Sequence, residues 1–145
     1  MRGYAAVGLN DPKTSSNVGA IMRAAGCYNV ALVALAGHRF QKWPTDTRNQ
    51  WKHMPLIECE DLHDVIPYAC VPVAIDLLEG AKSLVDFVHP ERAFYIFGAE
   101  DQTLGKAVTS WCKYKIFVPT NGCMNLAAAV NVVLYDRLAK QLRGK

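Results

Sequence analysis

The sequence predicts an α/β fold in which helices cover both faces of a mostly parallel sheet. Short apolar runs of the length of buried strands recur along the chain, and segments with helical spacing lie between them. The chain has 145 residues, of which 51% are hydrophobic, so one compact domain with a sizeable core is expected. No repeat, low-complexity tract or linker divides it, and we therefore expect a single domain over residues 1–145.

The apolar runs predict the strands in order. The expected strands are Tyr4–Leu9, Val30–Leu35, Val71–Ile75, Ala93–Phe97 and Tyr114–Val118, with Pro55–Ile57 as a weaker candidate.

Helical segments are predicted between these strands. Ser16 or Asn17 caps a first helix that runs to Ala25 and ends at Gly26. Asp61–Ile66 and Gly105–Ser110 are shorter candidates. The last helix, from Asn125 to Leu142, is the clearest one, because it carries an apolar stripe opposite a polar side. The stripe consists of Leu126, Val130, Leu134, Leu138 and Leu142, and the polar residues are Asp136, Arg137, Lys140 and Arg143.

Composition and missing motifs exclude several classes of protein. The net charge of +3 is compatible with a polyanionic partner. Five cysteines without a C-x-x-C pair argue against a disulfide framework or a zinc site and favour a reducing compartment. We see no signal peptide and no apolar run long enough for a membrane span, so a cytoplasmic protein without a resident metal is expected. Dinucleotide-binding and P-loop glycine patterns are missing as well.

Three polar islands stand at the edges of apolar runs, at residues 17–23, 97–105 and 118–126. They read Asn-Val-Gly-Ala-Ile-Met-Arg, Phe-Gly-Ala-Glu-Asp-Gln-Thr-Leu-Gly and Val-Pro-Thr-Asn-Gly-Cys-Met-Asn-Leu. In this order and spacing the chain resembles the SpoU-type branch of the SPOUT superfamily, the knotted RNA ribose 2′-O-methyltransferases. The resemblance covers nearly the whole chain. It implies a C-terminal trefoil knot, S-adenosylmethionine as methyl donor and a homodimer formed through the C-terminal helix region.

Arg23 is the first candidate catalytic residue. It lies in an otherwise apolar stretch, so its charge needs either a partner or an opening to solvent. It could be a surface arginine or part of a structural salt bridge, or it could clamp a phosphate beside the reacting ribose. The resemblance makes Arg23 central to catalysis and adds Asn17, Glu100 and Asn125 to an active-site polar network. Because a guanidinium hardly deprotonates, we expect Arg23 to orient the nucleotide and to stabilise oxyanion charge.

A donor pocket is expected at the carboxyl ends of the strands. Gly98 lets the backbone approach a ligand closely, and the strand end at residues 75–77 either forms a wall of the pocket or is an ordinary strand end. The resemblance adds the loop before the last helix. The expected lining residues are Ile75, Asp76, Leu77, Gly98, Val118, Cys123, Met124 and Leu126.

Cys123 departs from the family, which usually has serine at this position. A thiol is a weaker hydrogen-bond donor than a hydroxyl, so its contact with donor or nucleotide should weaken. An alternative makes Cys123 a covalent nucleophile, although no histidine stands in an obvious partnering motif.

The segment from His38 to His53 combines cations with aromatic rings. Cations reach phosphates and rings stack on unpaired bases, so the segment is a candidate RNA contact. The alternative is an amphipathic surface helix. The expected RNA-binding residues are Arg23, Arg39, Lys42, Arg48 and Lys52.

The resemblance implies an S-adenosylmethionine-dependent RNA methyltransferase that modifies a ribose 2′-hydroxyl, and the composition and motifs are consistent with it. With nothing visible beyond the expected catalytic domain, the chain resembles the minimal family members that act on tRNA, and this resemblance makes tRNA the preferred substrate. The alternatives are an rRNA methyltransferase, a catalytically silent RNA-binding homologue, and an enzyme that methylates a small molecule or a protein.

Overall fold

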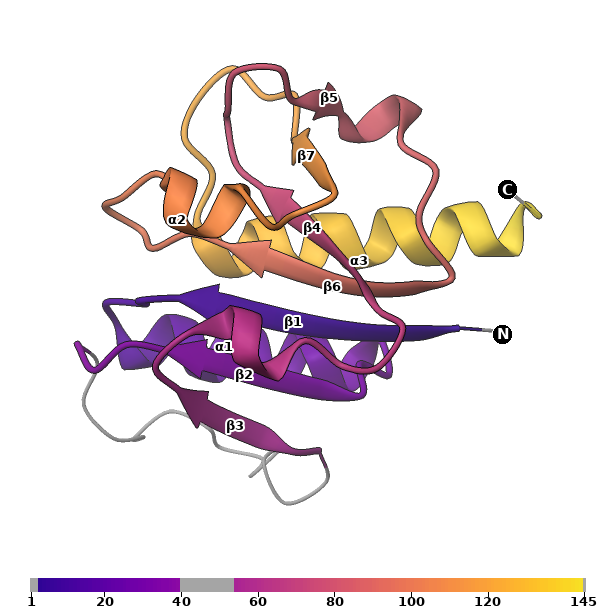
Figure 1. Ribbon diagram of the computed structural model, residues 1–145. Coiled ribbons are helices and arrows are strands. Elements are labelled where there is room, and N and C mark those ends of the chain that lie inside the picture. The colour runs from indigo at the N-terminus through magenta and orange to yellow at the C-terminus, as the bar shows by residue number, and fades with distance from the viewer. Residues whose placement is uncertain (1–2, 40–53, 145) are drawn as a thin grey trace.

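Seven parallel strands form one sheet in the computed structural model, which describes residues 3–39 and 54–144. In the sheet they follow the order β3-β2-β1-β6-β4-β7-β5, and all of the described strand pairs are parallel. Figure 1 shows the sheet running through the middle of the molecule. The strands are β1 (Tyr4–Asn10), β2 (Leu32–Ala36), β3 (Leu56–Cys59), β4 (Val71–Ile75), β5 (Lys82–Ser83), β6 (Arg92–Phe97) and β7 (Tyr114–Phe117).

The apolar runs predicted all of these strands except β5. The prediction for β4 has the observed bounds, and the others differ by a few residues at their ends. β5 has only two residues, Lys82–Ser83, which is too short for an apolar pattern to show. β7 ends at Phe117, so Val118 is the first residue of the following loop.

The two long helices lie on the same face of the sheet, behind it in Figure 1. Val7 and Leu9 of β1 share one core with buried side chains of both helices. The helices are α1 (Ser15–Cys27), the one-turn α2 (Lys106–Thr109) and α3 (Leu126–Leu142), with 3-10 turns η2 (Leu62–Val65) and η3 (Leu84–Asp86).

Short elements cover the other face of the sheet, so helices on both faces are found only in part. Leu62 of η2 and Val108 of α2 pack there against the buried side chains of the sheet. Phe94 and Ile96 fill the space over small residues, and an added Cβ at Gly8 would lie 2.9 Å from both side chains. These large side chains leave little depth for a long helix, so a turn and a short helix suffice to exclude water.

α1 begins and ends outside its predicted bounds. Its N-cap is Thr14 rather than Ser16 or Asn17, and the helix ends one residue after Gly26. The chain turns away at Asn29, whose φ of 56° is in the left-handed region. Because the helix starts at Ser15, Asn17 lies within its first turn, close to the N-cap Thr14.

α3 is anchored to the segment that leads into β6 by two buried cations that the sequence places on its polar side. Arg137 is 6% exposed and Lys140 is 9% exposed. Each donates to two backbone carbonyl oxygens of the segment 84–91, over 2.6–2.8 Å. Lys140 also pairs with Asp136. These bonds hold α3 against the chain that leads into β6.

The direction of winding reverses between β1 and β6. The chain runs outward from β1 to β2 and β3, whereas β6 lies on the other side of β1 and β4 lies beyond it. Ligands of open parallel sheets bind outside the carboxyl ends of the strands at such a reversal. The loops that follow β1 and β6 are therefore the place to look for a site.

Candidate functional site

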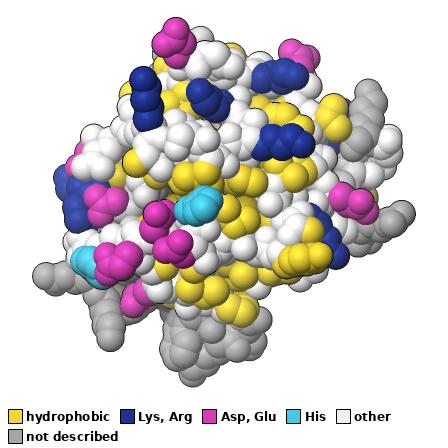
Figure 2. Space-filling model, viewed as in Figure 1, with side chains coloured by type: hydrophobic (Ala, Val, Ile, Leu, Met, Phe, Trp, Pro, Cys, Tyr) yellow, Lys and Arg dark blue, Asp and Glu magenta, His cyan; other side chains and the backbone are white. Residues whose placement is uncertain are grey.

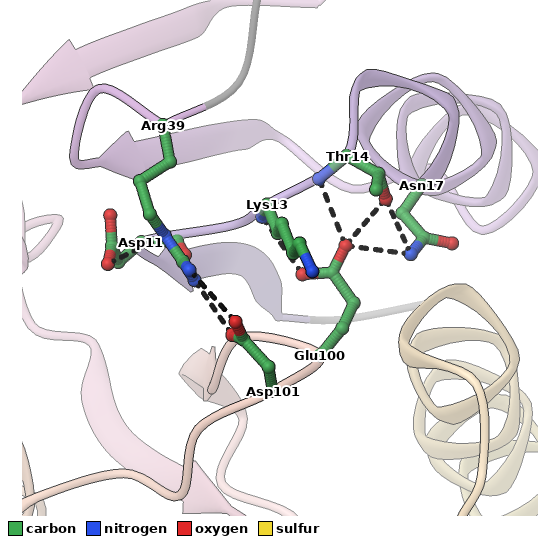
Figure 3. Close-up of polar contacts among 7 residues, drawn as sticks. All are labelled: Asp11, Lys13, Thr14, Asn17, Arg39, Glu100 and Asp101. Carbon is green, nitrogen blue, oxygen red and sulfur yellow. Dashed lines mark hydrogen bonds and ion pairs between the residues drawn. The ribbon is translucent and has the colours of Figure 1, made fainter.

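The carboxylate of Glu100 lies at the N-terminus of α1 (Figure 3). Its Oε1 accepts from the backbone N–H of Lys13 at 2.9 Å, and its Oε2 accepts from the N–H of Thr14 at 3.1 Å. Oε2 also accepts from the hydroxyl of Thr14 at 2.6 Å and from Nδ2 of Asn17 at 2.9 Å. An anion suits this position, because N–H groups at a helix N-terminus lack intrahelical partners. Glu100 thus joins the loop after β6 to the loop after β1.

These hydrogen bonds keep Glu100 ionised. Partial burial acts to raise its pKa, but the bonds from Thr14, Asn17 and the backbone of Lys13 outweigh burial and lower the pKa to about 2. A carboxylate with so low a pKa is a weak base at neutral pH. Glu100 is therefore suited to hold donors in place rather than to remove a proton.

The network continues from α1 to α3 through two asparagines. Nδ2 of Asn125 donates to Oδ1 of Asn17 over 3.2 Å. Oδ1 of Asn125 accepts from the N–H of Ala128 at 3.1 Å, which makes Asn125 the N-cap of α3. Three of the four expected catalytic residues, Asn17, Glu100 and Asn125, are thus connected by direct hydrogen bonds.

Arg23 is exposed on α1, between the buried Met22 and Ala24. The opening to solvent that the sequence left as one alternative is therefore present. Along the helix axis Arg23 lies about 9 Å from Asn17. An exposed guanidinium at this position can bind a phosphate through two N–H donors.

The expected donor-pocket residues follow three strands that are neighbours in the sheet, β6, β4 and β7. Gly98, Asp76 and Val118 therefore lie at the same sheet edge. Oδ2 of Asp76 accepts from the N–H of Leu104 at 2.8 Å, and an added Cβ at Gly98 would lie 3.3 Å from this oxygen. A glycine at this position lets the loop after β6 pack closely on the loop after β4.

The other donor-pocket residues differ in exposure. Ile75 and Leu126 belong to the core, where they support the loops that follow or precede them. Leu77 is 79% exposed, Cys123 is exposed and Met124 is half-buried. The edge of the sheet therefore offers both apolar side chains and accessible loop backbone to a ligand.

Arg39 is exposed, and its guanidinium is held by two carboxylates (Figure 3). Its Nη1 and Nη2 donate to the two oxygens of Asp101 over 3.0 and 2.9 Å. Its Nε lies 3.0 Å from Oδ2 of Asp11. The other expected RNA-binding residues of this segment, Lys42, Arg48 and Lys52, lie outside the described residues.

The sequence did not reveal the roles of Thr14, Asp11 and Asp101. Thr14 stands three residues before Asn17, but a capping box needs Glu or Gln there and the Thr14 side chain makes no capping bond, so no local pattern identified it. Asp101 carries no local signal either, because its partner Arg39 is 62 residues away in the chain.

A covalent role for Cys123 gains no support from the described histidines. His38 bonds to Glu60 and His89 bonds to Asp136, while the ring of His63 packs on that of Trp111. In the part of the chain that the structure describes, no three His, Cys, Asp or Glu side chains could hold a metal ion. None of the described helices is long and apolar enough to cross a membrane.

Residues 4–135 match the model of the SpoU rRNA Methylase family. Comparison with curated proteins gives no match. The SpoU methyltransferase AviRb from Streptomyces viridochromogenes aligns with a TM-score of 0.86 at 22% identity, over 100% of this chain and 62% of AviRb. The chain thus spans less than two thirds of that protein.

Two further solved structures are similar. An AdoMet-bound rRNA methyltransferase from Sinorhizobium meliloti aligns with a TM-score of 0.80 at 21% identity, over 98% of this chain and 57% of that protein. A protein solved to explain 2-OH methylation of C/U34 on tRNA aligns with a TM-score of 0.81 at 22% identity, over 99% of both chains. At these identities the likeness concerns the fold.

Proposed function

Since the chain belongs to the SpoU rRNA Methylase family, we propose that it transfers a methyl group from S-adenosylmethionine to a ribose 2′-hydroxyl of RNA. One observation within the chain carries the proposal. The Glu100–Asn17–Asn125 network brings residues of the three polar islands together where the sheet reverses its winding. Converging polar groups at the carboxyl ends of parallel strands are typical of a binding or catalytic site.

The methyl donor fits the loops that follow β4, β6 and β7. Leu77 and Met124 offer apolar contact, and the backbone around Gly98 and Cys123 offers hydrogen-bonding groups. The sulfonium of the donor supplies an already activated methyl group. As the oxygen–methyl bond forms, the methyl–sulfur bond breaks, S-adenosylhomocysteine leaves and the hydroxyl proton passes to water. The task of the protein is then to hold the ribose hydroxyl in line with that methyl group and to exclude competing nucleophiles.

The acceptor nucleotide is oriented by Arg23 and Asn17. Arg23 binds the phosphate beside the reacting ribose and stabilises negative charge that develops on the oxygen. The N–H donors of Asn17 are directed to Glu100 and Thr14. Its Oδ1 accepts from Asn125 and retains a second lone pair, to which a ribose hydroxyl can donate.

Exposed lysines support an RNA partner. In Figure 2 the cations gather in the upper part of the view, where Figure 1 shows α2, β5 and β7. Tyr114 of β7 is 39% exposed, and Nζ of Lys113 lies 5.5 Å from its ring centroid. Ammonium groups beside an exposed ring suit a phosphate backbone with unpaired bases. The exposed lysines in or directly next to these elements are Lys82, Lys106, Lys113 and Lys115, which we call the lysine cluster.

Within this proposal tRNA is the preferred substrate. The alignment over 99% of both chains with the protein from the tRNA study supports this choice over rRNA. The proposal also includes a C-terminal trefoil knot, a homodimer formed through the α3 region, and a cytoplasmic location.

The test is transfer of labelled methyl from S-adenosylmethionine to unmodified tRNA, followed by nuclease mapping. Wild type should place label in a ribose-methylated dinucleotide, and Arg23→Ala should lose it. Arg92→Ala serves as the control, because Arg92 is exposed at the opposite end of β6.

Other outcomes separate the alternatives. Label in rRNA but not in tRNA would mean that rRNA is the substrate. Donor binding without transfer to any RNA would indicate a silent RNA-binding homologue. Transfer to a small molecule or a protein alone would contradict an RNA enzyme.

A further inference from the structure

Arg39 makes four polar contacts with two acidic residues from different loops. Nη1 and Nη2 donate to the oxygens of Asp101 over 3.0 and 2.9 Å, which is a bidentate pair. Nε lies 3.0 Å from Oδ2 of Asp11, and Nη2 donates to the carbonyl oxygen of Asp11 over 2.7 Å. These contacts occupy most of the N–H donors of the guanidinium.

The three residues follow three neighbouring strands. Asp11 follows β1, Arg39 follows β2 and Asp101 follows β6, and the sheet order is β2-β1-β6. Arg39 therefore ties together the loops on both sides of the point where the winding reverses. Asp101 is also the next residue after Glu100, whose carboxylate binds the backbone at Lys13 and Thr14.

The backbone around Asp11 is shaped for this contact. Asp11 has a φ of 59°, an uncommon value for a residue with a side chain, and its N–H donates to the carbonyl of Ala36 over 2.6 Å. Gly37 has a φ of 108°, and an added Cβ there would collide with Oδ1 of Asp11. Uncommon backbone conformations persist where surrounding contacts hold them, and they cluster at functional sites.

The carboxylates around Arg39 favour a contact within the protein over direct RNA binding. Two carboxylates face the one guanidinium, and the hydrogen bond from Arg39 lowers the pKa of Asp101. An RNA phosphate would have to displace a carboxylate from Arg39 and would then meet both negative charges. Arg39 is thus poorly placed to bind a phosphate and well placed to bind its own loops.

We propose that Arg39 is a positioning residue, which fixes the loop carrying Glu100 by clamping Asp101 and Asp11. It acts on the candidate site through Glu100 and Asn17 and does not touch the substrate. This inference rests on the proposed methyl transfer, but its structural consequence can be measured without any activity.

The kinetic test compares Arg39→Gln and Asp101→Asn with wild type. Each should lower kcat about tenfold or more, because a small displacement of the site is costly in rate. The KM for RNA and the affinity for S-adenosylmethionine should stay within about twofold. The kcat of the double variant should be little lower than that of either single variant, because both substitutions remove the same interaction. Arg92→Gln, remote from the site, is the matched control.

A phosphate contact would produce a different pattern. Arg39→Gln would then raise KM and reduce the dependence of RNA binding on salt, with a slope smaller by about one. Asp101→Asn would leave RNA affinity unchanged or improve it, because a competing carboxylate would be gone. That combination would overturn the proposal.

Hydrogen exchange provides the readout that is independent of activity. The N–H groups of Lys13 and Thr14 donate to Glu100, so they should exchange faster in Arg39→Gln than in wild type. The thermal midpoint is recorded in parallel, and Asp101→Asn repeats the measurement if Arg39→Gln folds poorly. Unchanged exchange at both positions would overturn the clamp. Failure of wild type to methylate any RNA would overturn the proposed function and leave this result standing.

Discussion

The side-chain amide of Asn125 donates to Oδ1 of Asn17 over 3.2 Å and joins the N-termini of α1 and α3. The two residues are 108 positions apart in the chain. Asn125 has a second task, because its Oδ1 caps α3 through the N–H of Ala128. Capping and network formation thus use different atoms of one side chain, and substitutions can separate them.

Asn125→Asp should keep the cap and lose the network bond. Aspartate is about as good an N-cap as asparagine, so the free energy of unfolding should change by less than about 0.5 kcal/mol. A carboxylate cannot donate to Asn17, so methyl transfer should fall about tenfold or more. Asn125→Ala should lose both, with a stability loss of about 1 kcal/mol. Denaturant unfolding and initial rates check the pair. Equal activity of Asn125→Asp and wild type would exclude a catalytic role of the bond.

Glu100→Gln should lower both activity and stability. The amide NH₂ of glutamine would face N–H donors of Lys13 or Thr14 that now donate to a carboxylate. Because the pKa of Glu100 is about 2 in the fold against an ordinary 4.5, its ionised form stabilises the fold above pH 4.5. That contribution disappears as the pH falls from 4.5 towards 2. Wild type should therefore lose more stability over this range than Glu100→Gln, as measured by denaturant unfolding at each pH. Parallel losses in the two proteins would contradict the lowered pKa.

Charge reversal in the lysine cluster should weaken RNA binding. Changing Lys82, Lys113 and Lys115 to Glu removes three cations, so RNA affinity should fall at least tenfold at low salt. The dependence of binding on salt should become shallower, while donor affinity stays unchanged. Filter binding over a series of salt concentrations measures both. Arg92→Glu is a single charge reversal outside the cluster, and a loss as large as that of Lys113→Glu alone would exclude a specific cluster.

The exposed side of α3 should form the proposed dimer interface. A groove of about 720 Å³ lies there, and its lining includes Val85, Val132 and Tyr135, which are 66%, 37% and 60% exposed. Apolar surface of this kind is a common mark of a protein interface. Val132→Glu with Tyr135→Glu should produce a folded monomer, because burying two carboxylates opposes association. Sedimentation of wild type and variant distinguishes the dimer from the monomer. A monomeric wild type at high micromolar concentration would contradict the homodimer.

Cys123→Ser should leave methyl transfer unchanged or raise it a few fold. Cys123 is exposed, so the smaller hydroxyl is accommodated, and it is a stronger donor than the thiol. This result would argue against the idea that cysteine marks a silent site. The exposed Cys27 gives the control Cys27→Ser. Complete loss of transfer in Cys123→Ser alone would instead indicate a specific chemical role for the thiol.

Local patterns predicted most of the fold. β4 has its predicted bounds, and α3 follows its cap at Asn125, because strand burial and helix capping depend on neighbouring residues. Local patterns gave wrong predictions where contacts with distant residues set the helix bounds or the burial of a side chain. The bounds of α1 follow from Thr14 and from the turn at Asn29, and Arg137 is buried because the segment 84–91 offers it carbonyl groups.

Sequence by itself determined the alternation of strands and helices, the parallel sheet, and the three islands that carry Asn17, Glu100 and Asn125. These features depend on the type and spacing of residues near one another in the chain. Tertiary structure decided which face the long helices share, that the islands meet through Glu100, and that Arg39 pairs with Asp101. The partners of these contacts are 62 to 108 residues apart, and only the strand order brings them within hydrogen-bonding distance.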